Sequence, residues 1–169
     1  MPLRILGAIM IVGATSVYGY MLVSDIKKRL NELLEMKRIM FLLKSETGYN
    51  AAPIKEALYN ISKRTSTKYT TIFKKIYDSN EVNIGEVWKR EWKSGLEKFH
   101  LSQEEKEEII NLSDSMGLQD VKSQNAQFDL YLLKLEESIR ELTEEIPKKN
   151  KVYKCVGIGG GVILAIIFL

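Results

Sequence analysis

The stretch IKKRLNELLEMKRIMFLLKSETG, residues 26–48, decides the fold because its apolar side chains recur every three or four positions. That spacing places them along one face of an α-helix. The stripe consists of Ile26, Leu30, Leu33, Leu34, Met36, Met40 and Leu43. Gly48 is a common kind of helix terminator, so we expect the helix to end near it. The uncharged run at residues 5–23 leads into this helix, and the two are predicted to form one continuous rod.

Two apolar runs lie at the ends of the chain. Residues 5–23 form 19 consecutive positions without a charge, and residues 155–169 form 15 more. A bilayer core about 30 Å thick requires roughly 20 helical residues, so we predict one transmembrane helix and a second, shorter one. The rival interpretation of the first run is a cleaved signal peptide. The apolar region of a signal peptide is usually about 7–15 residues long, shorter than the run at residues 5–23, so we favour the membrane helix. In the second run, Gly157 and Gly161 have the GxxxG spacing that lets membrane helices pack closely, although glycine is common in such helices anyway.

These runs divide the chain into an N-terminal transmembrane helix at 1–23, a helical domain at 24–150 and a C-terminal transmembrane helix at 151–169. Basic residues gather on the domain side of both runs, at Lys27, Lys28, Arg29, Lys148, Lys149, Lys151 and Lys154. Positive residues beside membrane helices favour the cytoplasmic side. We therefore expect a two-pass protein of the cell membrane, in contact with lipid, whose central domain is cytoplasmic.

The central domain carries no excess charge. Residues 24–150 contain 22 basic and 22 acidic residues, and the net charge of +3 comes from Arg4, Lys151 and Lys154. A nucleic-acid-binding domain should show a basic stripe, so nucleic acid is not an expected partner. The chain has one cysteine, which excludes an internal disulfide.

Helical periodicity continues through the domain and predicts six helices in all, with no convincing strand. After the first helix, Pro53 suits the first turn of a second. Asn83 with Glu86 and Ser102 with Glu105 have the spacing of capping boxes, and Gly117 should end the helix that begins at Ser102. The last helix should begin at Asp120 and end at Pro147. The connections are short. We therefore predict an all-α fold, a compact antiparallel bundle of about six helices flanked by the transmembrane helices, with the first and last bundle helices side by side.

Residues that could carry catalysis are poorly placed. His100 is the sole histidine and has no nearby cysteine or histidine with which to bind zinc. The acidic run at residues 104–108 suits a solvated first helical turn better than a metal cluster. The glycines of residues 157–161 lack the Gly-Lys-Ser/Thr of a phosphate-binding loop. We expect a protein that is not an enzyme and that uses no cofactor or metal.

Two polar motifs stand out between the predicted helices. ETGYNAAPIKEAL at residues 46–58 contains Glu46, Tyr49 and Pro53, and LQDVKSQ at residues 118–124 contains Asp120 and Gln124. Glu46 falls at a helix C-terminus, where the helix dipole disfavours an anion. One interpretation is two capped turns. The other is a structural knot or docking surface in which Glu46, Tyr49, Asp120 and Gln124 hydrogen-bond to one another or to a partner.

At these motifs the chain resembles the stage III sporulation protein AB family of endospore-forming bacteria. The similarity rests on Leu6-Gly7, Glu46-Thr47-x-Tyr49-x-x-x-Pro53-Ile54-x-Glu56-Ala57-Leu58, Gly117-Leu118-x-Asp120-x-x-x-Gln124 and the glycine-rich C-terminal run. It covers essentially the whole chain. The two motifs together are fairly specific, and Pro53-Ile54 stands where the family usually has Pro-Leu, a conservative difference.

The resemblance implies a non-enzymatic platform subunit of the channel complex that connects mother cell and forespore, similar to the cytoplasmic domains of type II secretion F proteins. It implies a domain in the mother cell, anchored in the outer forespore membrane. The expected partners are other subunits of the complex, an ATPase among them. The alternative is a membrane-tethered helical signalling adaptor. Self-association is left open.

Overall fold

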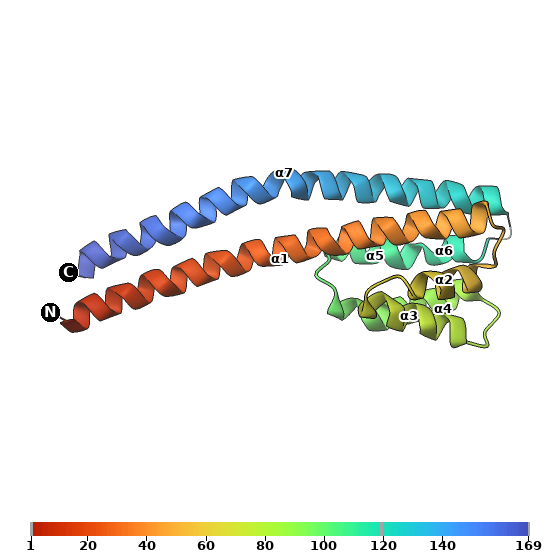
Figure 1. Cartoon of the computed structure of the whole chain (residues 1–169), viewed down its shortest axis with the longest axis horizontal. Helices are drawn as coiled ribbons and strands as arrows, with labels where there is room; N and C mark the ends of the chain where they lie inside the picture. Colours follow the sequence, from red (N-terminus) through yellow and green to blue (C-terminus); the bar gives the residue numbers. More distant parts are fainter. Residues whose placement is uncertain (1, 119, 169) are drawn as a thin grey trace. The chain divides into compact units, whose positions relative to one another are not determined.

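The computed structural model describes residues 2–118 and 120–168, apart from many side chains in the two terminal apolar runs (Figure 1). All regular secondary structure in this part of the chain is helical, which confirms that the fold is all-α. The helices are α1 (Pro2–Gly48), α2 (Ile54–Ser62), α3 (Thr67–Asp78), α4 (Ile84–Gly95), a 3-10 turn η1 (Leu96–Lys98), α5 (Gln103–Asn111), α6 (Ser113–Met116) and α7 (Val121–Phe168). The chain forms two compact units, one of Asn31–Ile139 and one that combines Met1–Leu30 with Arg140–Leu169.

In the unit Asn31–Ile139, α1 and α7 run side by side in opposite directions (Figure 1). Lys44 pairs with Asp129 at 2.5 Å, and Lys37 pairs with Glu136 at 2.9 Å. The earlier residue of α1 thus pairs with the later residue of α7, as antiparallel helices require. The prediction that the first and last bundle helices pack together is therefore confirmed for this unit.

The core of this unit lies between α1, α7 and the short helices. Leu33, Met36, Met40 and Leu43 of the predicted stripe are completely buried, whereas Leu34 is 45% exposed and is wrongly included in it. Five buried aromatic side chains form a cluster with neighbouring ring centres 5.0–6.2 Å apart: Tyr69, Phe73, Trp88, Trp92 and Phe99. Aromatic rings bury large areas, so this cluster supplies much of the hydrophobic stabilisation of the unit.

Two predicted helix starts are confirmed by their caps. Ser102 and Glu105 form the full reciprocal capping box, at 3.2 Å and 2.7 Å. The Asn83 side chain accepts the backbone N–H of Glu86 at 3.3 Å. Both caps satisfy backbone donors that the first turn of a helix leaves without an intrahelical partner.

Two predicted boundaries are wrong. The segment from Ser102 to Gly117 is not one helix, because α5 ends at Asn111 and α6 begins at Ser113. The break at Leu112 brings the carbonyl of Ser113 close to Gly85 in α4. A Cβ atom on residue 85 would lie only 2.5 Å from that carbonyl oxygen. The last helix does not end at Pro147 but continues through it to Phe168. Proline removes one helical hydrogen bond and favours a kink, yet a helix with enough residues on both sides can continue past it.

The unit Met1–Leu30 with Arg140–Leu169 consists of the two ends of α1 and α7. Within the part of it that the structure describes, Lys28 pairs with Asp25 and Lys149 with Glu145. The bond from Lys149 holds the pKa of Glu145 below its usual value. Among the residues that could be assessed, no helix combines the length and apolar character needed to cross a bilayer. The predicted membrane helices are thus not confirmed, and the contact predicted at Gly157 and Gly161 lies outside the described side chains.

Candidate docking groove

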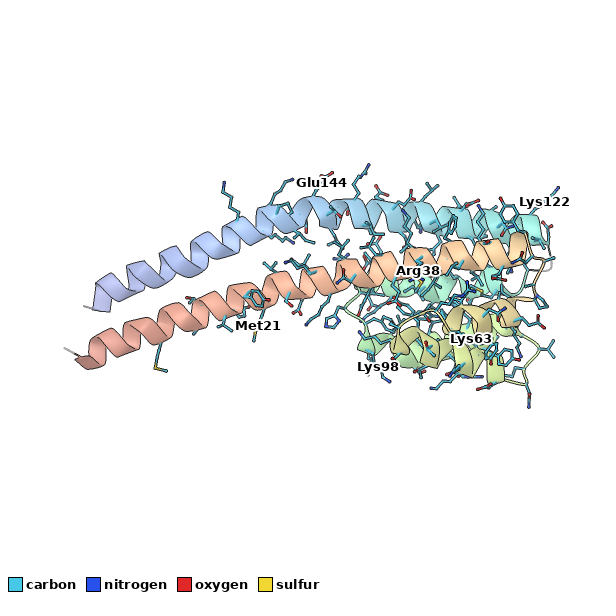
Figure 2. The ribbon with its side chains drawn as sticks, viewed as in Figure 1. Met21, Arg38, Lys63, Lys98, Lys122 and Glu144 are labelled. Atoms are coloured by element: carbon cyan, nitrogen blue, oxygen red, sulfur yellow. The ribbon has the colours of Figure 1, made fainter. Side chains whose placement is uncertain are left out.

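The two polar motifs contribute to one groove in the unit Asn31–Ile139. The groove has a volume of about 630 Å³. It is lined by Thr47, Ala51, Ala52, Pro53, Ile54, Val82, Asn83, Ile84, Met116, Gly117, Leu118, Val121 and Gln124. It therefore lies where α1 ends and α7 begins, the end of the unit that Lys122 marks in Figure 2. We call it the end groove.

The first motif reverses the chain after α1. The N–H of Tyr49 continues the helical pattern to the carbonyl of Ser45 at 3.0 Å, and the N–H of Ala52 then donates to the carbonyl of Glu46 at 3.1 Å. Between them Ala51 adopts φ 49°, in the left-handed region that favours glycine. This strained turn delivers Pro53 to the position before α2, where its carbonyl accepts the N–H of Ala57 at 3.0 Å.

Gln124 fixes the other wall of the end groove. Its side chain is buried, and its Nε2 donates to the carbonyl of Ser115 at 2.9 Å, which ties α7 to α6. A bond to a backbone carbonyl in a buried setting stabilises by roughly 0.5–1.5 kcal/mol and costs more if its partner is lost. Gln124 is therefore a structural residue of the groove wall.

Asp120 caps α7, as predicted. Its carboxylate accepts the Ser123 hydroxyl at 2.6 Å and the N–H groups of Ser123 and Lys122 at 3.0 and 3.3 Å. The Ser123 hydroxyl, followed by these two N–H groups, lowers the pKa of Asp120 below its usual value. The carboxylate is thus held as an anion at the helix N-terminus, where the dipole favours it.

In the described part of the chain, the side chains of Glu46 and Tyr49 bond to neither Asp120 nor Gln124. Glu46 accepts the side-chain amide of Asn50 at 3.1 Å, one helical turn away. Tyr49 is 89% exposed and lies on a different surface. Among the described hydrogen bonds, the backbone N–H of Gln124 donates to the Asp120 carbonyl at 3.0 Å within the first turn of α7, and none joins Glu46 or Tyr49 to either of these residues. The motifs therefore form two separately bonded turns that share a groove. A role in docking stays a prediction.

The end groove exposes apolar side chains, one of which lies outside both sequence motifs. Val82, in the loop between α3 and α4, is 98% exposed, and Leu118 and Val121 are 41% and 44% exposed. Val82 could have been noticed as an apolar residue within the otherwise polar stretch at residues 78–83. Among the described residues, none that lines the groove carries a charge. The arrangement can hold an apolar segment and offers no acid, base or anionic ligand set.

A second feature that the sequence analysis missed is the buried carboxylate of Glu32, which is 8% exposed. It accepts Lys68 Nζ at 2.7 Å and the backbone N–H of His100 at 2.6 Å, with His100 Nδ1 3.4 Å away. The Glu32 carbonyl also accepts the Tyr69 hydroxyl at 2.9 Å. Glu32 thus joins α1 to α3 and to the loop before α5. Among the described residues, no group of three or more potential metal ligands converges.

Comparisons with known proteins agree on one family. Residues 4–169 match the family described as Stage III sporulation protein AB. Stage III sporulation protein AB of Bacillus subtilis (strain 168) is 24% identical over 170 residues, which cover 99% of each chain. A solved structure of Stage III sporulation protein AB superposes with a TM-score of 0.65 at 20% identity, over 71% of this chain and 97% of that one, and shows that the fold is shared. With nearly its whole length matched, the chain belongs to the stage III sporulation protein AB family, and its role lies in sporulation.

Proposed function

We propose that this chain is a membrane-anchored, non-enzymatic platform subunit of the channel complex between mother cell and forespore. The observation that carries the proposal is the end groove, in which both sequence motifs converge on an uncharged and partly exposed apolar surface. Catalysis requires a positioned acid, base, nucleophile or metal, and this surface presents none. Membership in a sporulation family supports the biological setting.

We propose that both ends of the chain lie in the outer forespore membrane, with the helical domain in the mother-cell cytoplasm. The support is the sequence, in which the uncharged run at residues 5–23 and the apolar run at 155–169 carry their basic flanks on the domain side. A cysteine in place of the exposed Asn80, in a Cys155→Ser background, tests this arrangement. An impermeant thiol reagent should label it only after the membrane is opened. Labelling of intact protoplasts would contradict the cytoplasmic placement.

The occupant that we propose for the end groove is a segment of another subunit of the complex that inserts an apolar side chain. Desolvating Val82, Leu118 and Val121 supplies about 25 cal/mol for each Å² of apolar surface removed from water. The polar groups of the groove wall are already bonded inside the chain, as Gln124 is to Ser115. The partner therefore has little polar surface to satisfy, and an apolar anchor suits the groove best.

The test is recovery of partners from sporulating cells with tagged full-length chain. Val82→Asp places a charge on the groove wall at a side chain that is 98% exposed, so it leaves the fold intact. Asn80→Asp places the same charge two residues away, outside the groove lining. We expect wild type and Asn80→Asp to retain channel subunits and the ATPase, and Val82→Asp to lose them.

Equal recovery by both variants would overturn the docking role of the groove. Recovery of a kinase or transcription factor in place of channel subunits would point to the signalling adaptor. A null strain should stop forespore development, and normal sporulation of that strain would overturn the platform role itself.

A further inference from the structure

A second surface of the unit Asn31–Ile139 lies along α1 and α7, away from the end groove. Its residues line a groove of about 540 Å³ and are Phe41, Lys44, Ser45, Tyr49, Asp129, Leu132, Leu133 and Glu136. We call this surface the α1/α7 face. Phe41 is 67% exposed, Leu133 62% and Tyr49 89%. Single exposed apolar residues are ordinary, but several large ones along one groove mark a surface that meets another protein.

The charges on the α1/α7 face follow a simple pattern. α1 contributes Lys44, and α7 contributes Asp129 and Glu136. Lys37 of α1 does not line the groove but borders it through its ion pair with Glu136. The two ion pairs lie at two heights along the helix axes, which we call levels. At each level α1 carries the positive charge and α7 the negative charge. The surface thus has a basic edge on α1 and an acidic edge on α7, and the exposed Phe41 and Leu133 line the same groove.

We propose that the α1/α7 face binds the same face of a second copy of this chain, with the two copies parallel and related by a twofold axis along the helices. A rotation about such an axis places the basic edge of one copy against the acidic edge of the other. Each residue keeps its height along the helices, so α1 of one copy lies opposite α7 of the other at the same level. Lys44 then meets Asp129 of the second copy, and Lys37 meets Glu136. At each level four charges alternate in sign around the axis, while the exposed rings and leucines of the two copies are removed from water. A twofold interface requires this kind of self-complementarity.

The charge pattern also excludes the opposite arrangement. A twofold axis perpendicular to the helices would place α1 against α1 of the second copy, with lysines facing lysines and carboxylates facing carboxylates. Like charges across an interface oppose association. The parallel arrangement is also the one available to two copies anchored in a single membrane. The pairing follows from the charges and the exposed apolar side chains of this face and does not require the proposed channel role.

A charge-swapped chain provides the decisive test. It carries Lys37→Glu, Lys44→Glu, Asp129→Lys and Glu136→Lys. Both ion pairs within the chain are kept with their signs reversed, and two identical swapped copies still place opposite charges against each other. Wild-type and swapped chains with different tags are co-expressed and purified in detergent. We expect each to pair with itself, and mixed pairs to fall roughly tenfold below random sharing, because every facing contact in a mixed pair is between like charges.

Random mixing of the two chains would overturn the proposal, because pairing would then come from another surface such as the membrane segments. Preferential mixing would overturn it too, since it would indicate the antiparallel arrangement. Monomeric wild-type chain in this assay would do the same. None of these outcomes bears on the end groove, whose test measures recovery of other proteins.

A second measurement concerns the apolar part of the face. The double variant Phe41→Ser and Leu133→Ser should be monomeric by light scattering in detergent, whereas Leu130→Ser should remain dimeric. Leu130 is 55% exposed on α7 but does not line this groove, so it serves as a matched control. Tryptophan fluorescence, which reports the buried Trp88 and Trp92, verifies that each variant is folded. A dimeric double variant that keeps the native fluorescence would contradict the proposed interface.

Discussion

Replacing Glu32 by glutamine tests whether the buried carboxylate holds the unit Asn31–Ile139 together. Glutamine has the same shape but presents one oxygen and one NH₂ group. The oxygen can keep the 2.6 Å bond from the N–H of His100, which the backbone fixes in place. The NH₂ group then faces the ammonium of Lys68, a donor opposite a donor, where the carboxylate accepted a bond of 2.7 Å.

The magnitude follows from the two bonds. A hydrogen bond to a charged group contributes about 1.5–3 kcal/mol. Lys68 is 41% exposed and can turn toward water, which limits its share, whereas the bond from His100 keeps its geometry but loses charge assistance. We expect a loss of about 2 kcal/mol in the free energy of unfolding, or a Tm lower by roughly 4–8 °C for a chain of this size. Thermal unfolding followed by the fluorescence of Trp88 and Trp92 measures it, since both are buried in the same unit.

Lys68→Met is the matched control for Glu32→Gln. It removes the ion pair alone, and a pair with one partner this exposed contributes about 0–1 kcal/mol. We therefore expect it to lower the Tm by less than half as much as Glu32→Gln. Equal effects of the two variants would refute the reasoning, because losing the negative charge on the acceptor of the His100 N–H would then cost nothing. An unchanged Tm for Glu32→Gln would show that Glu32 does not connect α1 to its neighbours.

Three further substitutions have expected effects on thermal stability, measured by circular dichroism. Trp88→Phe should cost about 1 kcal/mol more than Trp92→Phe, because the indole N–H of Trp88 is bonded whereas that of Trp92 is buried without a partner among the described residues; equal costs would contradict this. Gly85→Ala should cost roughly 1–3 kcal/mol, since its Cβ would lie 2.5 Å from the Ser113 carbonyl, and a neutral result would show that α6 can move. Ala51→Gly should gain about 1 kcal/mol by relieving the left-handed φ, whereas a loss would locate strain elsewhere.

Much of the fold is predictable from local patterns in the sequence. The helical spacing of Leu33, Met36, Met40 and Leu43 identified the buried face of α1, and Gly48 identified its end. The error at Leu34 shows the limit of this reasoning, because periodicity gives the centre of an apolar stripe but not its width. The width depends on the shape of the elements that pack against the helix, which only the folded chain determines.

The candidate site was predictable in part, for a similar reason. The caps and turns of both motifs are local, so the cap at Asp120 followed from its position before α7. The third wall of the end groove, around Val82, comes from a loop whose place is set by distant contacts such as that of Gly85 with Ser113. The buried position of Glu32 likewise depends on Lys68 and His100, which are far from it in sequence.

Two kinds of residue shape the end groove, which the two motifs and the loop at Val82 form together. The polar side chains, such as Asp120 and Gln124, are bonded inside the chain and give the end groove its shape. The side chains left free to meet a partner are apolar, such as Val82 and Leu118. Substitutions of the first kind should therefore lower stability and affect binding only through it, whereas substitutions of the second kind should affect binding at unchanged stability. The end groove thus has a polar framework and an apolar contact surface, and a partner selected by it has to be recognised by shape and hydrophobicity.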